Sequence, residues 1–365
     1  MGSATADPKP LIWLMDNADA PVRYRTAREL LGDNKTANKL EAELLDHALV
    51  KRWLFNLKPQ DPPLKRWMEH GSFDTCLENA LCKLVQLGLH GGLPQVTDAV
   101  SFYLAKMEAY ASLAQKRRNF SAILSANLMS LAGVENAAIW HVMLESLDEM
   151  FRFTQTRDYD LYLGEADRAK LTGIPTCWKH KKHFIRPELY GAYGFAYPLI
   201  YDIAGLHTLY GLHDPAIDRK IDTVIRYIST DTFHSTVADG YGILVEGDGV
   251  YHSMGWDPKY PGWFDVASYL RQGPMPRLLF YAQFACRYPH ARNTPWFREL
   301  LACLDTYQTG EGRYAFPAAW FTEKQGYAVM GSHLSFGENR RKKNWREIES
   351  TFYMQLLHHH RALPS

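Results

Sequence analysis

Residues capable of binding ligands or catalysing reactions gather between residues 177 and 190. Cys177, His180 and His183 are three residues apart, a spacing that could place soft zinc ligands on one side of a turn. The lysines of the same segment would repel a metal ion, and no fourth ligand is evident. The basic side chains could instead form a pocket for a carboxylate, phosphate or diphosphate. This basic set is His180, Lys182, His183 and Arg186. An ordinary polar loop is the third interpretation.

Glu188 and Tyr190 close this segment, where a largely apolar helix is predicted to begin. A carboxyl group held against aromatic walls has its charged form disfavoured, so Glu188 could act as a general acid. A carboxylate at this position could equally complement the positive end of the helix dipole. We predict Glu188 and Tyr190 as catalytic residues. The predicted substrate-binding residues of the segment are Trp178, His180, His183 and Arg186.

A second group, between residues 246 and 265, combines carboxylates, one histidine and large aromatic residues. Aromatic walls with an acid could fold and protonate an apolar polyene, whereas aromatic platforms with two carboxylates could bind and cleave a sugar. The catalytic candidates here are Asp248, His252 and Asp257. The predicted walls are Tyr251, Trp256 and Trp263, together with Tyr193 and Tyr197 from the apolar helix. Asp265 could also be the N-cap of the next helix.

A repeated pattern of helical hairpins must position these segments. Asp214 and Pro215 are predicted to begin one helix, as are Thr294 and Pro295, because these residue types favour the N-cap and first helical positions. We predict no strand longer than a few residues. A short helix is predicted to start at Asp19 and to stop at Gly32. The other predicted helices cover residues 39–54, 74–88, 95–110, 120–133, 137–153, 190–210, 215–229, 265–287, 296–307 and 345–358.

The helices of a pair differ in apolar pattern. The helices at 190–210 and 265–287 are apolar nearly all round, whereas those at 215–229 and 296–307 carry one apolar stripe. Helices of the first kind are buried on every side and those of the second kind lie outside. Inner helices that alternate with outer ones predict an all-α fold, an α/α toroid. Three prolines should kink or shorten the inner helices: Pro198, Pro274 and Pro276.

The predicted domain organisation has three parts. Residues 1–10 form a frayed or artificially added terminus, residues 11–72 a helical extension, and residues 73–365 the toroid. Long aromatic, glycine-rich segments at 154–189, 230–264 and 308–344 should cover one mouth of the toroid.

Composition narrows the possible functions. The 365 residues carry a net charge of +1, which argues against a dedicated nucleic-acid binder. No apolar run is long enough to span a bilayer and no signal peptide is recognisable. Five scattered cysteines argue against a disulfide framework. We therefore expect a cytoplasmic protein with reduced thiols and a small-molecule substrate, and the sequence leaves its oligomeric state open.

The stretch from Leu304 to Tyr314 resembles a degenerate form of the glutamine–tryptophan repeat of squalene and other triterpene cyclases, with Tyr314 in place of the Trp. The hairpins over residues 73–360 are similar to those of this superfamily, which includes the β subunits of protein prenyltransferases. The resemblance implies an α/α toroid. The Asp-x-Asp-Asp acid of the cyclases is missing, since Asp158–Tyr159–Asp160–Leu161 lacks the last carboxylate. Asp74–Thr75–Cys76 has the Asp-x-Cys spacing of the prenyltransferase zinc site, without an identifiable histidine ligand.

We expect an enzyme with an aromatic-lined central cavity that acts on a largely apolar, isoprenoid-like small molecule. Its chemistry would be acid–base: a cyclisation, isomerisation or elimination that needs no cofactor, zinc being the one metal with any support. A carbohydrate-active toroid, hydrolase or lyase, is the first alternative. A non-catalytic helical scaffold is the second.

Overall fold

The fold is given by a computed structural model. It describes residues 8–58, 68–112, 120–181, 183–190, 196–238, 241–246, 250–255, 258–273, 275–321 and 329–363.

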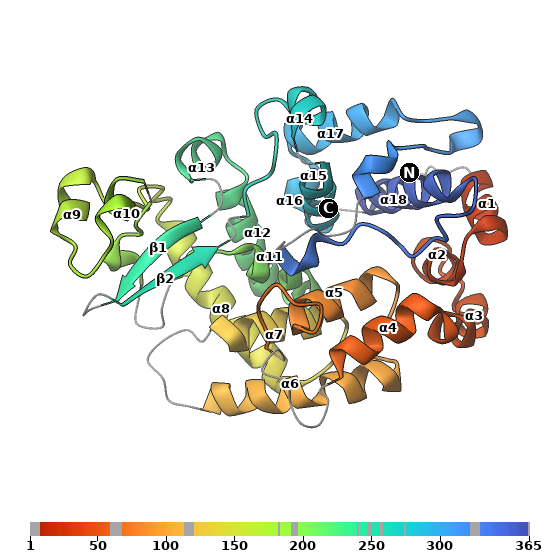
Figure 1. The fold of residues 1–365 in the computed structure, drawn as a ribbon, viewed down its shortest axis with the longest axis horizontal. Coiled ribbons are helices and arrows are strands. Elements are labelled where there is room, and N and C mark those ends of the chain that lie inside the picture. The colour runs from red at the N-terminus through yellow and green to blue at the C-terminus, as the bar shows by residue number, and fades with distance from the viewer. Residues whose placement is uncertain are drawn as a thin grey trace. The chain divides into compact units, whose positions relative to one another are not determined.

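Helices form most of the described chain, which bears out the prediction of a mainly helical protein (Figure 1). The helices up to residue 155 are α1 (Lys9–Asn17), α2 (Ala20–Arg25), the π-helical turn η1 (Thr26–Leu30), α3 (Asn34–Asp46), α4 (Ala48–Leu57), α5 (Leu77–Gln86), α6 (Pro94–Ser112), α7 (Phe120–Leu131) and α8 (Ala137–Gln155). The helices that follow are α9 (Glu165–Lys170), α10 (Thr176–Lys181), α11 (Ile200–Leu206), α12 (Pro215–Ile228), α13 (Asp231–Thr236), α14 (Val266–Gln272), α15 (Met275–Ala285), α16 (Pro289–Arg292), α17 (Pro295–Asp305) and α18 (Trp345–Ala362). Short 3₁₀ helices are η2 (Pro187–Tyr190), η3 (His207–Leu212), η5 (Gly310–Gly312), η6 (Ala318–Phe321) and η7 (Val329–Ser332).

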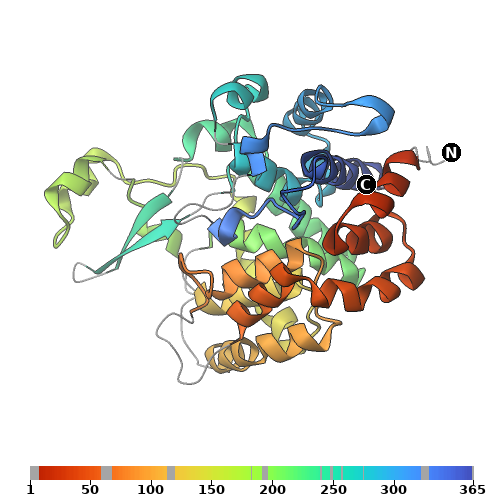
Figure 2. The ribbon, with the colours of Figure 1, turned by 45° about the vertical axis from the view of Figure 1, so that its right-hand side comes forward.

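The chain divides into two compact units. Unit 1 consists of Met1–Leu104, Leu131–Val134 and Pro261–Ser365, and unit 2 consists of Ala105–Ser130 and Glu135–Tyr260. In unit 1, α1 packs against α18 and α4 packs against α5, so the N-terminal helices share this unit with the C-terminal ones (Figure 2). In unit 2, α8 packs against α12. The predicted division at residues 10 and 72 stays a prediction.

The predicted helix starts agree with the structure. The carboxylate of Asp214 accepts a hydrogen bond from the backbone of Ala216, and Pro215 occupies the first turn of α12. The Thr294 hydroxyl accepts from Phe297 at the start of α17. The Asp265 carboxylate accepts a hydrogen bond from the Ser268 N–H group, so Asp265 is the N-cap of α14. This is one of the two roles that the sequence analysis considered for Asp265. Each cap satisfies an N–H group that has no partner within its helix.

The burial of the helices alternates. All nine residues from Ala122 to Ser130 of α7 are buried, and so is every residue of α11. In α12 the buried residues instead form one stripe, and α17 shows the same pattern. This alternation agrees with the difference in apolar pattern between the two kinds of helix.

Two predicted inner helices are shorter than expected. Within 190–210, the regular helix begins only at Ile200, because Pro198 lacks an N–H group and disfavours helical backbone at Tyr197. The Asp202 carboxylate then accepts from the Leu199 N–H group at 3.0 Å and caps the start of α11. The predicted helix at 265–287 is divided into α14 and α15, with Pro276 in the first turn of α15, where proline is tolerated.

A β-hairpin corrects the expectation that the chain has no appreciable strand. Strands β1 (Tyr241–Glu246) and β2 (Val250–Gly255) pair antiparallel, with Glu246 opposite Val250. The physical reason is local: residues that favour extended backbone flank a glycine-containing connection, which is a hairpin signal. Figures 1 and 2 show the hairpin beside α9 and α10.

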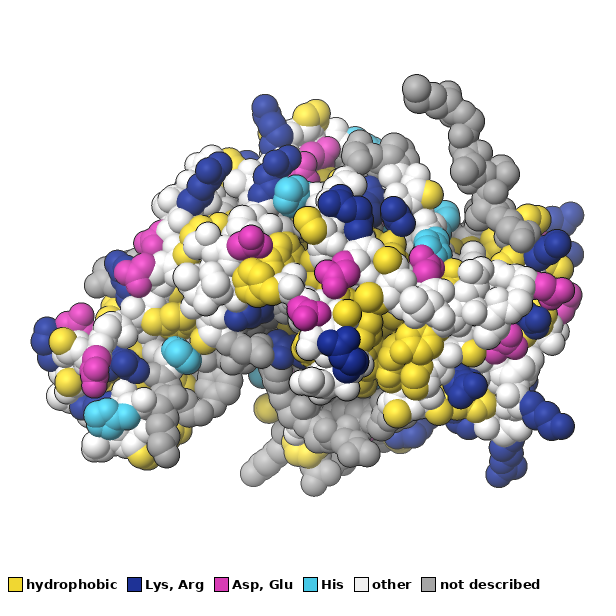
Figure 3. Space-filling model, turned by 90° about the horizontal axis from the view of Figure 1, so that it is seen from above, with side chains coloured by type: hydrophobic (Ala, Val, Ile, Leu, Met, Phe, Trp, Pro, Cys, Tyr) yellow, Lys and Arg dark blue, Asp and Glu magenta, His cyan; other side chains and the backbone are white. Residues whose placement is uncertain are grey.

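None of the described helices is both long enough and apolar enough to cross a membrane. Basic and acidic side chains are interspersed on the face shown in Figure 3, in keeping with the net charge of +1.

Candidate functional site

In unit 2, the segment at 177–190 is joined by backbone hydrogen bonds to strand β1, whose hairpin partner β2 contains residues 250–255 of the second segment. The N–H group of Ile243 in β1 donates to the His183 carbonyl at 2.7 Å, and the Ile185 N–H group donates to the Ile243 carbonyl at 2.9 Å. On its other side, the segment pairs with residues 161–163 through an antiparallel bridge between Ile185 and Tyr162. Three stretches far apart in the sequence thus form one small irregular sheet.

A hydrophobic cluster supports this sheet. Ile174, Phe184 and Ile243 are buried together, and Trp178 packs against them while remaining partly exposed. The predicted substrate contact Trp178 therefore contributes to packing. This is the ordinary role of a large aromatic side chain beside a sheet.

Two basic residues of the segment bond to other parts of the protein. Arg186 forms an ion pair with Asp160, with 2.6 Å between Nη1 and Oδ2. Lys179 donates to the carbonyls of Ala169 and Leu171. His180 is exposed, and the exposed ring of His183 lies 5.1 Å from that of Tyr162. Lys182, the other member of the predicted cationic pocket, lies outside the described residues.

No group of three or more His, Cys, Asp or Glu side chains in metal-binding positions occurs among the described residues. Cys177 is exposed, and Cys76 of the Asp-x-Cys spacing is buried. Asp74 faces Arg52, with 3.4 Å between the charged groups.

The predicted catalytic residues are placed only in part. Glu188 and Tyr190 belong to η2, three and five residues after Ile185. His252 lies in β2 opposite Leu244, and Tyr251 lies opposite Val245. The structure describes the backbone, not the side chains, of these four residues. Four predicted residues lie outside the described chain altogether: Tyr193, Asp248, Trp256 and Asp257.

The two remaining aromatic residues that were predicted to line the substrate site belong to different units. Tyr197 is 2 % exposed in unit 2 and stacks on Phe233, with 6.2 Å between ring centroids. Trp263 belongs to unit 1, where its ring stacks on Trp296 at 6.5 Å. Tyr197 thus forms part of the aromatic core of unit 2, and Trp263 packs on a helix of unit 1.

A cavity that the sequence analysis did not identify lies in unit 1. Its volume is about 40 Å³, enough for a few water-sized groups. Helix α15 and the turn after it supply Phe280, Gln283, Phe284 and Arg287. Helix α5 supplies Cys82, Val85 and Gln86, and the remaining lining residues are Leu131, Met330 and His333. A signal was present in the sequence, since Gln283 and Arg277 are the two polar residues of the otherwise apolar helix α15.

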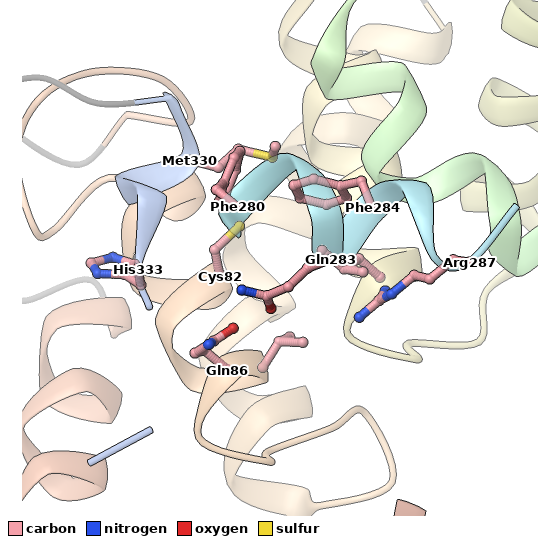
Figure 4. A pocket seen from close by; sticks show the side chains of 10 residues that line it. Cys82, Gln86, Phe280, Gln283, Phe284, Arg287, Met330 and His333 are labelled. Atoms are coloured by element: carbon pink, nitrogen blue, oxygen red, sulfur yellow. The ribbon is translucent and has the colours of Figure 1, made fainter. Parts of the chain in front are cut away.

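One wall of the cavity is a tightly constrained turn. Met330 and Gly331 have φ angles of 46° and 73°, in the left-handed region. A Cβ atom on Gly331 would lie 2.2 Å from Nε2 of His333, so only glycine fits there. His333 Nε2 is 3.2 Å from the Asn79 carbonyl and its ring contacts that of Trp53. In Figure 4 this ring points away from Cys82 and Gln283.

Buried charges hold the segment that follows His333. Lys83 of α5 donates to the Ser335 carbonyl at 2.8 Å, and the Ser335 hydroxyl donates to Glu349 of α18 at 2.9 Å. Burial raises the pKa of Glu349, an effect that Arg340, 3.4 Å away, opposes. Because unpaired buried charges are costly, these contacts fix the segment against both helices.

The thiol of Cys82 is not a nucleophile in this setting. Burial raises its pKa well above the ordinary value, and the Glu78 carboxylate adds to the effect. A thiol must lose its proton to attack a substrate or bind a metal ion. Cys82 therefore serves as a neutral wall of the cavity.

The chain was compared with known protein families, with curated proteins and with solved structures, and no match was found.

Proposed function

We propose that the chain is an enzyme that acts on a largely apolar, isoprenoid-like small molecule by acid–base chemistry. The observation that carries this proposal is the pairing of Ile243 with His183 and Ile185. It joins the segment that contains Glu188 to strand β1, and the hairpin partner β2 contains His252. An acid and a base on neighbouring segments suit a reaction that adds a proton at one carbon and removes one from another.

The chemistry follows from the two residue types. A carboxylic acid at Glu188 would donate its proton to a double bond of the substrate, and the imidazole of His252 would accept a proton from an adjacent carbon. Such a proton exchange isomerises the substrate without any oxidant or reductant, and ring closure between the two steps would make it a cyclisation. Asp248, Asp257 and Tyr190 remain predicted participants.

We also infer that the helices form an α/α toroid. Two features support this arrangement: the alternation of fully buried helices with single-stripe helices, and the position of α5 and α15. Helix α15 lies within one of the two predicted inner helices, and it lines the cavity of unit 1 together with α5. An inner ring of helices around a common cavity is what a toroid requires.

Deuterium exchange tests the proposed activity even while the substrate is unidentified. The purified protein is incubated in D₂O with an extract of apolar metabolites, and mass spectrometry follows each compound. We expect at least one compound to gain deuterium or to change into an isomer. The variants Glu188→Gln and His252→Gln should slow this reaction about a hundredfold or more.

Two exposed residues of α8 provide matched controls. Glu145→Gln and His141→Gln make the same chemical changes at side chains that are 69 % and 66 % exposed, and they should leave the rate unchanged. The proposal is wrong if no apolar compound changes, or if all four variants behave like the wild type. Breakdown of an oligosaccharide pool instead would show a carbohydrate-active enzyme.

A further inference from the structure

The cavity of unit 1 lies between regularly spaced residues of two helices. Phe280, Gln283, Phe284 and Arg287 follow the spacing of three, four and seven residues that places side chains on one face of a helix. The hydrogen bond from the Arg287 N–H group to the Phe284 carbonyl continues the helical turn beyond the end of α15. The opposite wall has the same pattern in Cys82, Val85 and Gln86 of α5.

Two amide side chains face each other across this space. Figure 4 shows Gln86 and Gln283 pointing toward one another, with Cys82 beside them. Nε2 of Gln283 is buried and makes no hydrogen bond of good geometry. A looser hydrogen-bonding contact of this side chain with Tyr353 lowers the pKa of that hydroxyl, which burial raises overall. Nε2 of Gln86 reaches only the Leu334 carbonyl, at 3.5 Å. A buried donor without a partner is costly, so a ligand that accepts its hydrogen bond would be stabilised.

The charge at the cavity is positive. Arg287 lies at one end, and none of the described residues that line the cavity is an aspartate or glutamate. The Glu29 carboxylate, which forms two 2.7 Å contacts with Arg25, also acts on Arg287 and raises its pKa. Burial lowers the pKa of Arg287, and Arg25 contributes in the same direction. An anion in the cavity would offset this loss of hydration.

We propose that the cavity binds the carboxylate group of a small organic acid. Arg287 and Nε2 of Gln283 donate hydrogen bonds to the two carboxylate oxygens, because a guanidinium group and an amide one helical turn apart can reach the same planar anion. The carbon chain of the acid contacts Phe280, Phe284 and Met330, which belong to the apolar part of the lining.

Charge favours a carboxylate over a phosphate, and size favours it over a diphosphate. A cavity of about 40 Å³ accepts the three heavy atoms of a carboxylate group together with the first carbon or two of its chain, whereas a diphosphate is far larger. A singly charged group matches Arg287, the one arginine or lysine among the described lining residues, and the nearby Glu29 would repel a dianion. This binding site lies in unit 1 and does not depend on the activity proposed for unit 2.

Titration calorimetry of the whole chain tests the proposal with three probes. They are propanoate, its neutral analogue propanamide, and inorganic phosphate. Propanoate should bind with a dissociation constant on the order of 1 mM, as expected for so small a ligand. Propanamide should bind about tenfold or more weakly, because it lacks the charge. Equal binding of the two, no binding of propanoate, or tighter binding of phosphate would each overturn the proposal.

Substitutions then locate the site. Arg287→Met should weaken propanoate binding about ten- to a hundredfold, Arg287→Lys should restore part of it, and Gln283→Leu should cost about three- to tenfold. Gln283→Leu keeps the side-chain volume and serves if Arg287→Met does not fold. The control is Arg219→Met, which removes the same charge at an exposed position of α12 and should change nothing. Wild-type affinity in both Gln283→Leu and a folded Arg287→Met protein would place the binding elsewhere and refute the assignment.

Discussion

Glu338 is a buried carboxyl group whose ionisation should weaken the fold of unit 1. It is 3 % exposed and belongs to a cluster, here called the latch, formed by Asp19, Glu338, Asn339 and Lys342. The Glu338 carboxyl accepts from the Asp19 N–H group at 2.6 Å and lies 3.3 Å from Lys342. The Asp19 carboxylate in turn accepts from the Asn339 N–H group at 2.7 Å. The latch thus connects the start of α2 to the segment before α18.

The expected pH dependence follows from the pKa of Glu338. Burial raises it from 4.5 to about 7, while the hydrogen bond from the Asp19 N–H group and the charge of Lys342 oppose the rise. The folded state therefore holds this proton more tightly than the unfolded state. Protonated Glu338 therefore contributes its full stabilisation of the fold below pH 4.5, and this stabilisation is lost as the pH rises through 7. The whole change corresponds to about 3 kcal/mol of unfolding free energy, and roughly 2.5 kcal/mol of it falls between pH 5 and pH 8.

The assay is urea unfolding, followed by circular dichroism, of the wild type and Glu338→Gln between pH 5 and pH 8. Glutamine keeps an oxygen that can accept from Asp19 but cannot ionise. Relative to the wild type, Glu338→Gln should therefore gain roughly 2.5 kcal/mol over this range. Glu299→Gln, at an exposed position of α17, is the control and should follow the wild type. Parallel profiles for the wild type and Glu338→Gln, within about 0.5 kcal/mol, would refute the reasoning.

Two further changes test how the chain is built. Gly331→Ala should destabilise the protein by more than about 2 kcal/mol, because the new Cβ would meet His333 at 2.2 Å in addition to the backbone strain. Gly133 has nearly the same φ angle, 72°, but open space around it, so Gly133→Ala should destabilise the protein by only about 1 kcal/mol. Equal shifts of the melting temperature in the two variants would contradict the predicted clash with His333. Asp214→Ala should lower the unfolding free energy by about 1 kcal/mol, because α12 loses its N-cap. Asp214→Asn should retain most of this stabilisation, because asparagine can also cap a helix. An equal loss of stability in both variants would argue against capping.

Local signals made part of the fold predictable. The caps at Asp214, Thr294 and Asp265 act within three residues of the helix they begin, so the sequence contains the whole interaction. The burial of α11 and the single stripe of α12 were also predictable, because burial determines which residue types a helix surface tolerates. The exact length of a helix was less predictable. Pro198 shortened the 190–210 helix further than a kink would have done.

Contacts between distant parts of the chain were not predictable from one sequence. Ile243 bonds to His183 and Ile185, almost sixty residues earlier, and no local pattern records such a pairing. The same limit applies to the aromatic residues predicted as substrate walls. Trp178, Tyr197 and Trp263 all pack on neighbouring side chains, and an aromatic residue has the same appearance in a sequence whether it contacts a core or a ligand.

Polar residues on buried helices distinguish a structural role from a ligand-binding role more clearly than aromatic residues do. Lys83 is 1 % exposed on α5, and its ammonium group donates to the Ser335 carbonyl, so the fold itself accounts for a charged residue there. Gln283 occupies a comparable place on α15, yet its Nε2 has no hydrogen-bond partner and borders a cavity that also contains Arg287. Folding alone would favour an apolar residue of similar volume at position 283, since a buried donor without a partner lowers stability. Gln283→Leu should therefore preserve or raise the thermal stability of the protein while weakening its affinity for propanoate. A variant that lost stability and kept its affinity would show that Gln283 is structural, as Lys83 is.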